Sequence, residues 1–162
     1  MGFFDITGSV TLHHELGEEK MAAVHRAYFA QGRALTEEFG GCVVKTNGDD
    51  VVSVFHTAVR AFDCALKWRA NTGHELVTMH IGIALGPGRI TDEGNDIHGD
   101  VMNFASRLEG VARKGEIVVS GIVKDHIDDL RAERHAEWLE KWIDRFLPFK
   151  GFGKRRVWIL PQ

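Results

Sequence analysis

The dipeptide Asn47-Gly48, which stands between two short apolar runs, constrains the fold more than any other feature of the sequence. The runs cover residues 42–45 and 50–55 and are rich in valine. Asn and Gly both tolerate positive φ, which the tight turns of β-hairpins require. The sequence therefore predicts a hairpin over this region and an antiparallel part of a sheet.

Helical and extended patterns alternate on both sides of this hairpin. A polar, glycine-rich stretch at 89–99 is interpreted as a strand end or an arm. This order of elements predicts a sheet with helices packed on it, an α/β or α+β sandwich. We expect helices over 18–39, 57–71, 100–112, 121–128 and 132–146, and strands at 3–4, 77–85, 116–120 and 156–160.

Composition indicates one ordinary globular domain over residues 1–162, with 44% apolar and 27% charged residues. A net charge of −3 argues against a nucleic-acid-binding protein. Because the apolar runs are short and no secretory signal is visible, we expect no membrane segment in this chain. Cys42 and Cys64 fit small buried residues of a reducing compartment, which predicts a cytoplasmic protein.

A carboxylate followed by a small loop stands near the start of the chain. Asp5 ends a short predicted strand, and Thr7-Gly8-Ser9 leads into a helix. Such a loop presents backbone N–H groups to phosphate, and the carboxylate can hold a metal ion on the same phosphates. The alternative is that Asp5 is an Asx-turn or N-cap residue.

The tip of the predicted hairpin carries a second acidic residue. Asp49 follows the Asn-Gly dipeptide, and Lys45 lies four residues before it. The tip is a candidate for a second metal ligand, and the alternative is a solvated turn, in which Asp is common.

A third cluster runs from Asp96 to Arg107. Asn103 and Arg107 are four residues apart on a predicted helix and therefore share one face. Arg can stabilise a phosphoryl transition state while Asn positions a sugar oxygen. The alternative is an exposed helix face on which Arg107 pairs with Glu109 or another neighbour.

In this order, the clusters resemble the catalytic domain of the class III nucleotidyl cyclases, the adenylate and guanylate cyclases. The resemblance covers nearly the whole chain, although the first strand looks truncated because only Met1-Gly2 precedes Phe3. The matching stretches are the Phe-x-Asp-Ile-x-Gly pattern around Asp5 and the segments 40–49, 81–86, 96–107, 115–120 and 147–152.

The resemblance implies a ferredoxin-like core with a central, mostly antiparallel sheet, working as a head-to-tail homodimer with sites at the subunit interface. Asp5 and Asp49 would bind two divalent metal ions, Mg²⁺ or Mn²⁺, and Ile6 would add a backbone carbonyl. Thr7 and Gly8 would contact the substrate phosphates.

The same resemblance assigns roles to the remaining clusters. Lys45 and Asp96 would read the base, Asn103 would orient the ribose, and Arg107 would neutralise charge on the α-phosphate. A basic residue near the last loop, Lys150 or alternatively Lys154, would hold the terminal phosphates. The metal ligands would come from one subunit, and Lys45, Asp96, Asn103 and Arg107 would come from its partner.

The base-reading pair predicts the substrate. A lysine can donate to adenine N1 and an aspartate can accept from its 6-amino group, whereas guanine has the opposite polarity at these positions. We therefore expect an adenylate cyclase that makes 3′,5′-cyclic AMP, with any regulatory domain outside this chain. The alternatives are a cyclase acting on GTP or a pyrimidine nucleotide, and a non-catalytic cyclase-like module that dimerises or binds nucleotide.

Overall fold

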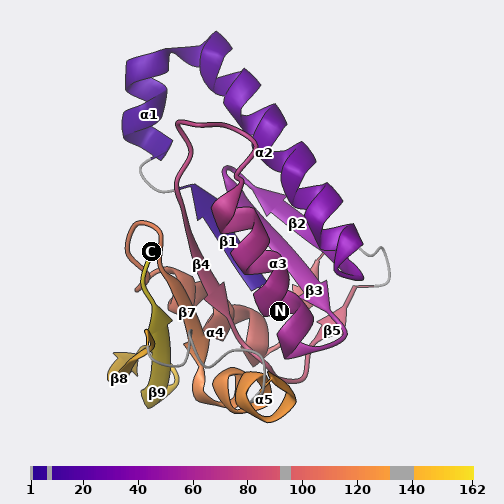
Figure 1. Ribbon diagram of the computed structural model, residues 1–162, viewed down its shortest axis with the longest axis vertical. Helices are drawn as coiled ribbons and strands as arrows, with labels where there is room; N and C mark the ends of the chain where they lie inside the picture. Colours follow the sequence, from indigo (N-terminus) through magenta and orange to yellow (C-terminus); the bar gives the residue numbers. More distant parts are fainter. Residues whose placement is uncertain (1, 7–8, 92–95, 132–140) are drawn as a thin grey trace.

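A seven-stranded sheet forms the centre of the protein (Figure 1). The computed structural model describes residues 2–6, 9–91, 96–131 and 141–162. The strand order is β2-β3-β1-β4-β7-β9-β8, and β4–β7 is the one parallel pair among these strands. The strands are β1 (Gly2–Ile6), β2 (Gly41–Asn47), β3 (Asp50–Phe55), β4 (Met79–Ile83), β7 (Ile117–Ser120), β8 (Ile143–Phe149) and β9 (Gly153–Leu160).

The first half of the chain builds the ferredoxin-like arrangement. In this βαββαβ unit, β1 lies between β3 and β4 and pairs with both in antiparallel fashion. The prediction of a mostly antiparallel α+β sheet is therefore confirmed, and its edge strand in this half is β2.

Helices cover both faces of the sheet (Figure 1). One face packs against α2, α3 and α5, with Tyr28, Phe62 and Trp68 fully buried. The other face packs against α4 through Val101, Ala105 and Leu108. The helices are α1 (Ser9–Leu16), α2 (Glu18–Glu38), α3 (Ala58–Ala70), α4 (Asp100–Glu109) and α5 (Gly121–Arg131). None of the helices within the described residues is long and apolar enough to cross a membrane.

The backbone of α4 lies directly on β4. A Cβ added to Gly82 of β4 would collide with the backbone of α4 at Ala105 and Glu109. Only glycine allows so close an approach at this position. The absence of a side chain at Gly82 therefore determines how closely α4 packs on the sheet.

The predicted hairpin is confirmed, with β2 and β3 joined by Gly48-Asp49. Gly48 has a φ of 65°, and no non-glycine residue in the described part of the chain has a positive φ. Positive φ at the first turn position alone fits a type II′ turn, so only Gly48, and not Asn47 with it, uses the left-handed region. The turn therefore begins one residue later than the Asn-Gly pair suggests and includes Asp49.

The C-terminal part of the chain departs from the sequence prediction. Residues 132–140 of the predicted 132–146 helix lie outside the described residues, and the structure has β8 from Ile143 onward. Trp142 is buried and stacks on Phe62, with ring centroids 5.4 Å apart, whereas Phe146 is 65% exposed. The helical prediction fails at 143–146 because pairing with β9 is a long-range contact that local spacing does not contain.

The two cysteines differ in their surroundings. Cys64 of α3 is buried, as expected, and burial raises the pKa of its thiol to about 12. Cys42 is exposed, so its prediction as a buried residue is wrong. It lies on β2, the edge strand, where one side of the strand has no neighbour in the sheet.

Candidate nucleotide-binding site

Lys45 and Asp96 meet although 51 residues separate them in the sequence. The Lys45 Nζ donates to Asp96 Oδ2 at 3.0 Å. The side chains are 36% and 32% exposed, so a ligand can reach both charged groups. The two residues predicted to read the base therefore form an ion pair within one chain, with each side chain about one-third exposed.

A β-bulge in β2 determines which way Lys45 faces. The register places Val43 opposite Ser53 and Lys45 opposite Val52, so Val44 is the extra residue. Bulges of this kind re-aim a side chain relative to the regular alternation. Val44 and Val52 both belong to the core beneath α4, and the bulge brings Lys45 to this same side of the sheet.

The carboxylate of Asp96 is held at both oxygens. Its Oδ2 accepts from Lys45, and its Oδ1 accepts from the Ile97 N–H at 2.8 Å. The Lys45 hydrogen bond, and after it the Ile97 hydrogen bond, hold the pKa of Asp96 below its usual value. Asp96 is therefore an ionised group that only accepts hydrogen bonds at neutral pH.

The predicted metal ligands gather at one end of the sheet. Phe4 of β1 pairs with Val51 of β3. Asp5 comes directly after Phe4 in β1, and Asp49 comes two residues before Val51 in the hairpin. β1 ends at Ile6 opposite Met79. The backbone thus brings Asp5, Ile6 and Asp49 to the same end of the sheet.

The oxygen ligands at this end of the sheet fit a hard divalent cation. Within the described part of the chain, the half-buried Asp49 carboxylate has no hydrogen-bonding or ion-pair partner. Carboxylate and carbonyl oxygens are the ligands that Mg²⁺ and Mn²⁺ prefer. No group of three or more His, Cys, Asp and Glu side chains among the described residues forms a metal cluster by itself.

Asn103 and Arg107 lie on the outer face of α4. Both are exposed, while Val101, Ala105 and Leu108 turn toward the sheet. The alternative pairing of Arg107 with Glu109 does not occur, because Glu109 Oε1 lies 2.9 Å from His80 Nε2. Arg107 has no ion-pair partner among the described residues, so its guanidinium is available to a ligand.

The predicted phosphate-binding residues are placed only in part. Thr7 and Gly8 lie outside the described residues. Lys150 is exposed in the turn between β8 and β9, on the far side of the sheet order from β2. Among the described residues, Lys150 therefore does not contact Lys45 or Asp96.

A small cavity that no sequence motif indicates lies beside Asp49. Its volume is about 140 Å³, and Ser9, His13, Met21 and His25 line it together with the turn. The His25 Nε2 atom is buried and has no hydrogen-bond partner among the described residues. Local spacing could not reveal this neighbourhood, because the residues come from α1, α2 and the hairpin turn.

Most of this chain matches a known protein family. The model of the adenylate and guanylate cyclase catalytic domain matches residues 1–139. The chain belongs to this family. The resemblance noted in the sequence motifs is therefore confirmed.

Similar proteins of this cyclase family include curated adenylate cyclases from bacteria. One from Streptomyces coelicolor is 29% identical over 119 residues, which cover 74% of this chain and 31% of the relative. One from Glutamicibacter nicotianae is 26% identical over 122 residues, covering 75% and 30%. This chain thus spans about a third of the length of the curated relatives it matches.

Solved cyclase structures share the fold. The adenylyl cyclase CyaB from P. aeruginosa superposes with a TM-score of 0.75 at 22% identity, covering 99% of this chain and 92% of that one. The guanylate cyclase domain of RhGC from Catenaria anguillulae, in complex with GTP, gives 0.75 at 22% identity, covering 98% and 93%. These likenesses establish the fold, and they include cyclases of both base preferences.

Proposed function

We propose that this chain is the catalytic domain of an adenylate cyclase, which converts ATP to 3′,5′-cyclic AMP and pyrophosphate in a homodimer. The observation that carries the proposal is the ion pair of Lys45 and Asp96, in which each side chain is about one-third exposed. Family membership alone leaves the base open, whereas this pair discriminates between bases.

The discrimination follows from hydrogen-bond polarity. An ammonium group only donates and an ionised carboxylate only accepts. Adenine accepts at N1 and donates from its 6-amino group, so Lys45 and Asp96 complement these two positions. Guanine reverses both polarities, which would set donor against donor and acceptor against acceptor in the same orientation.

Two residues of α4 serve the reacting groups. Arg107 carries a permanent charge in a planar fork of donors, which suits an α-phosphate that gains negative charge in the transition state. Asn103 lies one turn earlier on the same exposed face and orients the ribose. The ribose 3′-oxygen forms a bond to the α-phosphorus and loses its proton, and the bond between the α-phosphorus and the bridging oxygen breaks to release pyrophosphate.

The metal ligands on this proposal are Asp5, Asp49 and the Ile6 carbonyl. Two bound Mg²⁺ or Mn²⁺ ions would lower the pKa of the 3′-hydroxyl and neutralise the triphosphate. Thr7 and Gly8 contribute backbone N–H groups to the phosphates, and Lys150 holds the terminal phosphates.

The homodimer completes each site on this proposal. Asp5 and Asp49 come from one subunit, and Lys45, Asp96 and the α4 residues come from its partner. The pairing of Lys45 with Asp96 inside one chain supports this division, since both must then belong to the same subunit. Two free cysteines support a cytoplasmic location. Any regulatory domain lies outside this chain.

The test is product identification. The protein is incubated with ATP, GTP, CTP and UTP separately, each with Mg²⁺ or Mn²⁺, and the products are identified by mass spectrometry. We expect cyclic AMP from ATP and little product from the other nucleotides. Asp49→Ala should abolish turnover, because one carboxylate ligand is lost.

Other outcomes would overturn the proposal in distinct ways. Cyclic GMP or a cyclic pyrimidine nucleotide as the main product would retain the chemistry and reject the base assignment. No cyclic product from any nucleotide, at protein concentrations that favour a dimer, would identify a non-catalytic module, in which Asp49→Ala leaves nucleotide binding or dimerisation intact.

A further inference from the structure

The backbone of Asp96 is held as firmly as its carboxylate, and the residue that holds it is Thr91. These two residues face each other where the small sheet of β5 (Arg89–Ile90) and β6 (Ile97–His98) ends. The Thr91 N–H donates to the Asp96 carbonyl at 2.9 Å. The Asp96 N–H donates to the Thr91 hydroxyl at 3.2 Å.

The hydrogen bond from the Asp96 N–H back to Thr91 differs from that of a regular antiparallel pair. In an antiparallel ladder, two hydrogen-bonded residues exchange N–H and carbonyl groups in both directions. Here the Asp96 N–H bonds to the Thr91 Oγ1 atom, so a side chain takes the place that a backbone carbonyl has in a regular pair. Most residue types would leave this N–H without an acceptor, because threonine and serine are among the few with a short side-chain oxygen.

This exchange has a consequence for the Asp96 side chain. Its backbone N–H and carbonyl are both bonded to Thr91, its Oδ1 accepts from Ile97, and its Oδ2 is thereby directed to Lys45. Backbone restraint fixes the origin of a short side chain such as aspartate, since only two rotatable bonds separate its carboxylate from the main chain.

We infer that Thr91 is a positioning residue for base recognition, whose hydroxyl holds Asp96 so that its carboxylate faces Lys45 and, in the complex, the 6-amino group of adenine. This inference rests on the proposed function and extends it to a residue that contacts no substrate. Thr91 acts on selectivity between bases, because a loosened carboxylate no longer enforces one polarity.

Thr91→Val and Thr91→Ser form a matched pair of variants. Valine keeps the branched shape and removes the acceptor, whereas serine keeps the acceptor and removes the methyl group. For Thr91→Val we expect the ratio of kcat/KM for ATP to that for GTP to fall about tenfold, the worth of one neutral hydrogen bond. KM for ATP should rise while kcat changes little, because contacts to the base bind substrate and transition state alike.

Thr91→Ser should restore the wild-type ratio. A wild-type ratio in Thr91→Val, or an equal loss in both variants, would overturn the inference, since the acceptor would then have no special role. A fall in kcat with unchanged KM would also overturn it, because that pattern indicates general damage to the site.

A second readout separates this inference from the proposed function. Hydrogen exchange at the Asp96 amide, measured by NMR without nucleotide, should be faster in Thr91→Val than in the wild type and restored in Thr91→Ser. Unchanged exchange overturns the structural link itself. If the exchange changes as expected but the wild type makes no cyclic AMP, the proposed function fails and the role of Thr91 in base selectivity fails with it.

Discussion

Two lysine–aspartate ion pairs in this chain differ in how much of the lysine side chain reaches solvent. In the first, Lys45 and Asp96 are both about one-third exposed and come from distant segments. In the second, the Lys124 side chain is only 5% exposed, and its partner Asp128 lies one turn further along α5. A ligand can reach both charged groups of the first pair, whereas in the second pair it can reach Asp128, which is 40% exposed, but not Lys124.

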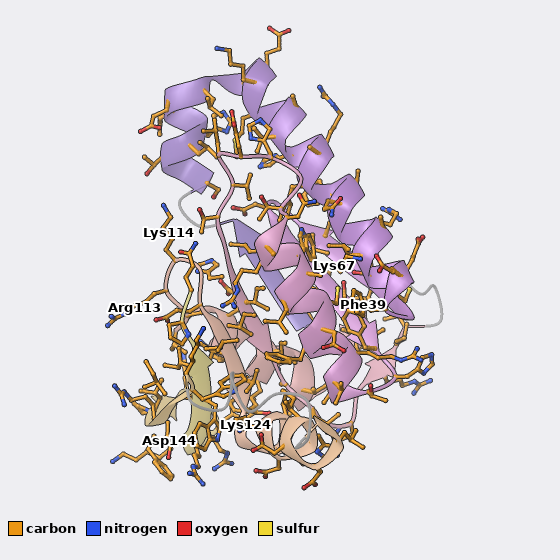
Figure 2. The ribbon with its side chains drawn as sticks, viewed as in Figure 1. Phe39, Lys67, Arg113, Lys114, Lys124 and Asp144 are labelled. Atoms are coloured by element: carbon orange, nitrogen blue, oxygen red, sulfur yellow. The ribbon has the colours of Figure 1, made fainter. Side chains whose placement is uncertain are left out.

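Aromatic rings account for the burial of Lys124 in the second pair. The Lys124 ammonium lies 5.5 Å from the ring centroid of Trp142 and 4.9 Å from that of Trp158. Lys124 thus lies where α5 meets the C-terminal strands (Figure 2). Cation–π contacts of this kind stabilise most when the cation is shielded from water. The same chemical pair is therefore proposed to read a base at one place and contributes to packing at the other, and the difference lies in the surroundings.

The largest effect should come from breaking the exposed pair. Lys45→Met should lower kcat/KM for ATP about 10- to 100-fold, because a charge-assisted hydrogen bond to the base is lost. The free energy of unfolding should change by less than about 1 kcal/mol, as for other exposed pairs. Steady-state kinetics and urea denaturation measure the two quantities.

Lys67→Met is the matched control for this variant. Lys67 bonds to Glu38 with both side chains about half exposed, and the pair lies between α2 and α3. We expect ATP turnover of this control to stay at the wild-type level. Equal losses of activity in both variants would show that Lys45 has no special role.

The pair with the buried lysine should respond in stability instead. Asp128→Ala should lower the free energy of unfolding by about 2 kcal/mol, because the Lys124 ammonium remains buried without its counter-charge. Urea denaturation measures this change, and KM for ATP should not move. Asp129→Ala, at the exposed neighbouring position, should change stability by less than about 0.5 kcal/mol. A drop of similar size in both aspartate variants would remove the distinction between the two pairs.

Removing the buried charge itself should have a smaller effect. Lys124→Met keeps an apolar stem against Trp142 and Trp158, and replacement of a buried ion by an apolar group is often neutral. We expect the free energy of unfolding to stay within about 1 kcal/mol of the wild type. A loss as large as that of Asp128→Ala would mean that the ammonium–indole contacts are a net source of stability.

The smallest effect is the titration of Asp96. Because its pKa is lowered in the folded protein, its contribution to stability is present above the ordinary aspartate pKa and is lost as the pH falls through the lower, folded value. A carboxyl-carbon NMR titration should give a midpoint below the ordinary aspartate value of about 3.9. In Lys45→Met the midpoint should rise, and an unmoved midpoint would contradict Lys45 as its principal cause.

Much of the fold could be predicted from the sequence, because its signals are local. The hairpin at 42–55 and the helices α2, α3 and α4 follow from turn chemistry and apolar spacing. β8 could not be predicted this way, since Ile143 and Phe146 owe their strand conformation to pairing with β9. Over so few residues, the apolar spacing of a helix cannot be distinguished from that of an edge strand.

The candidate site was predictable in its members but not in its geometry. The motifs identified Lys45 and Asp96, yet the bulge at Val44 that turns Lys45 toward Asp96 leaves no mark in a run of valines. Thr91 carried no signal either, because its role depends on a hydrogen bond across β5 and β6. Both features belong to strand register, which is fixed by contacts between distant segments.

Because Gly82 lies against the backbone of α4, a side chain at position 82 would change the position of this helix. A methyl group there would push against the backbone at Ala105 and Glu109 and lift the helix away from β4. Asn103 and Arg107 stand on the opposite surface of that helix, so they would move outward with it. Position 82 is thus a place where one added carbon atom, hidden under the helix, would displace both proposed catalytic side chains together while leaving their chemistry intact.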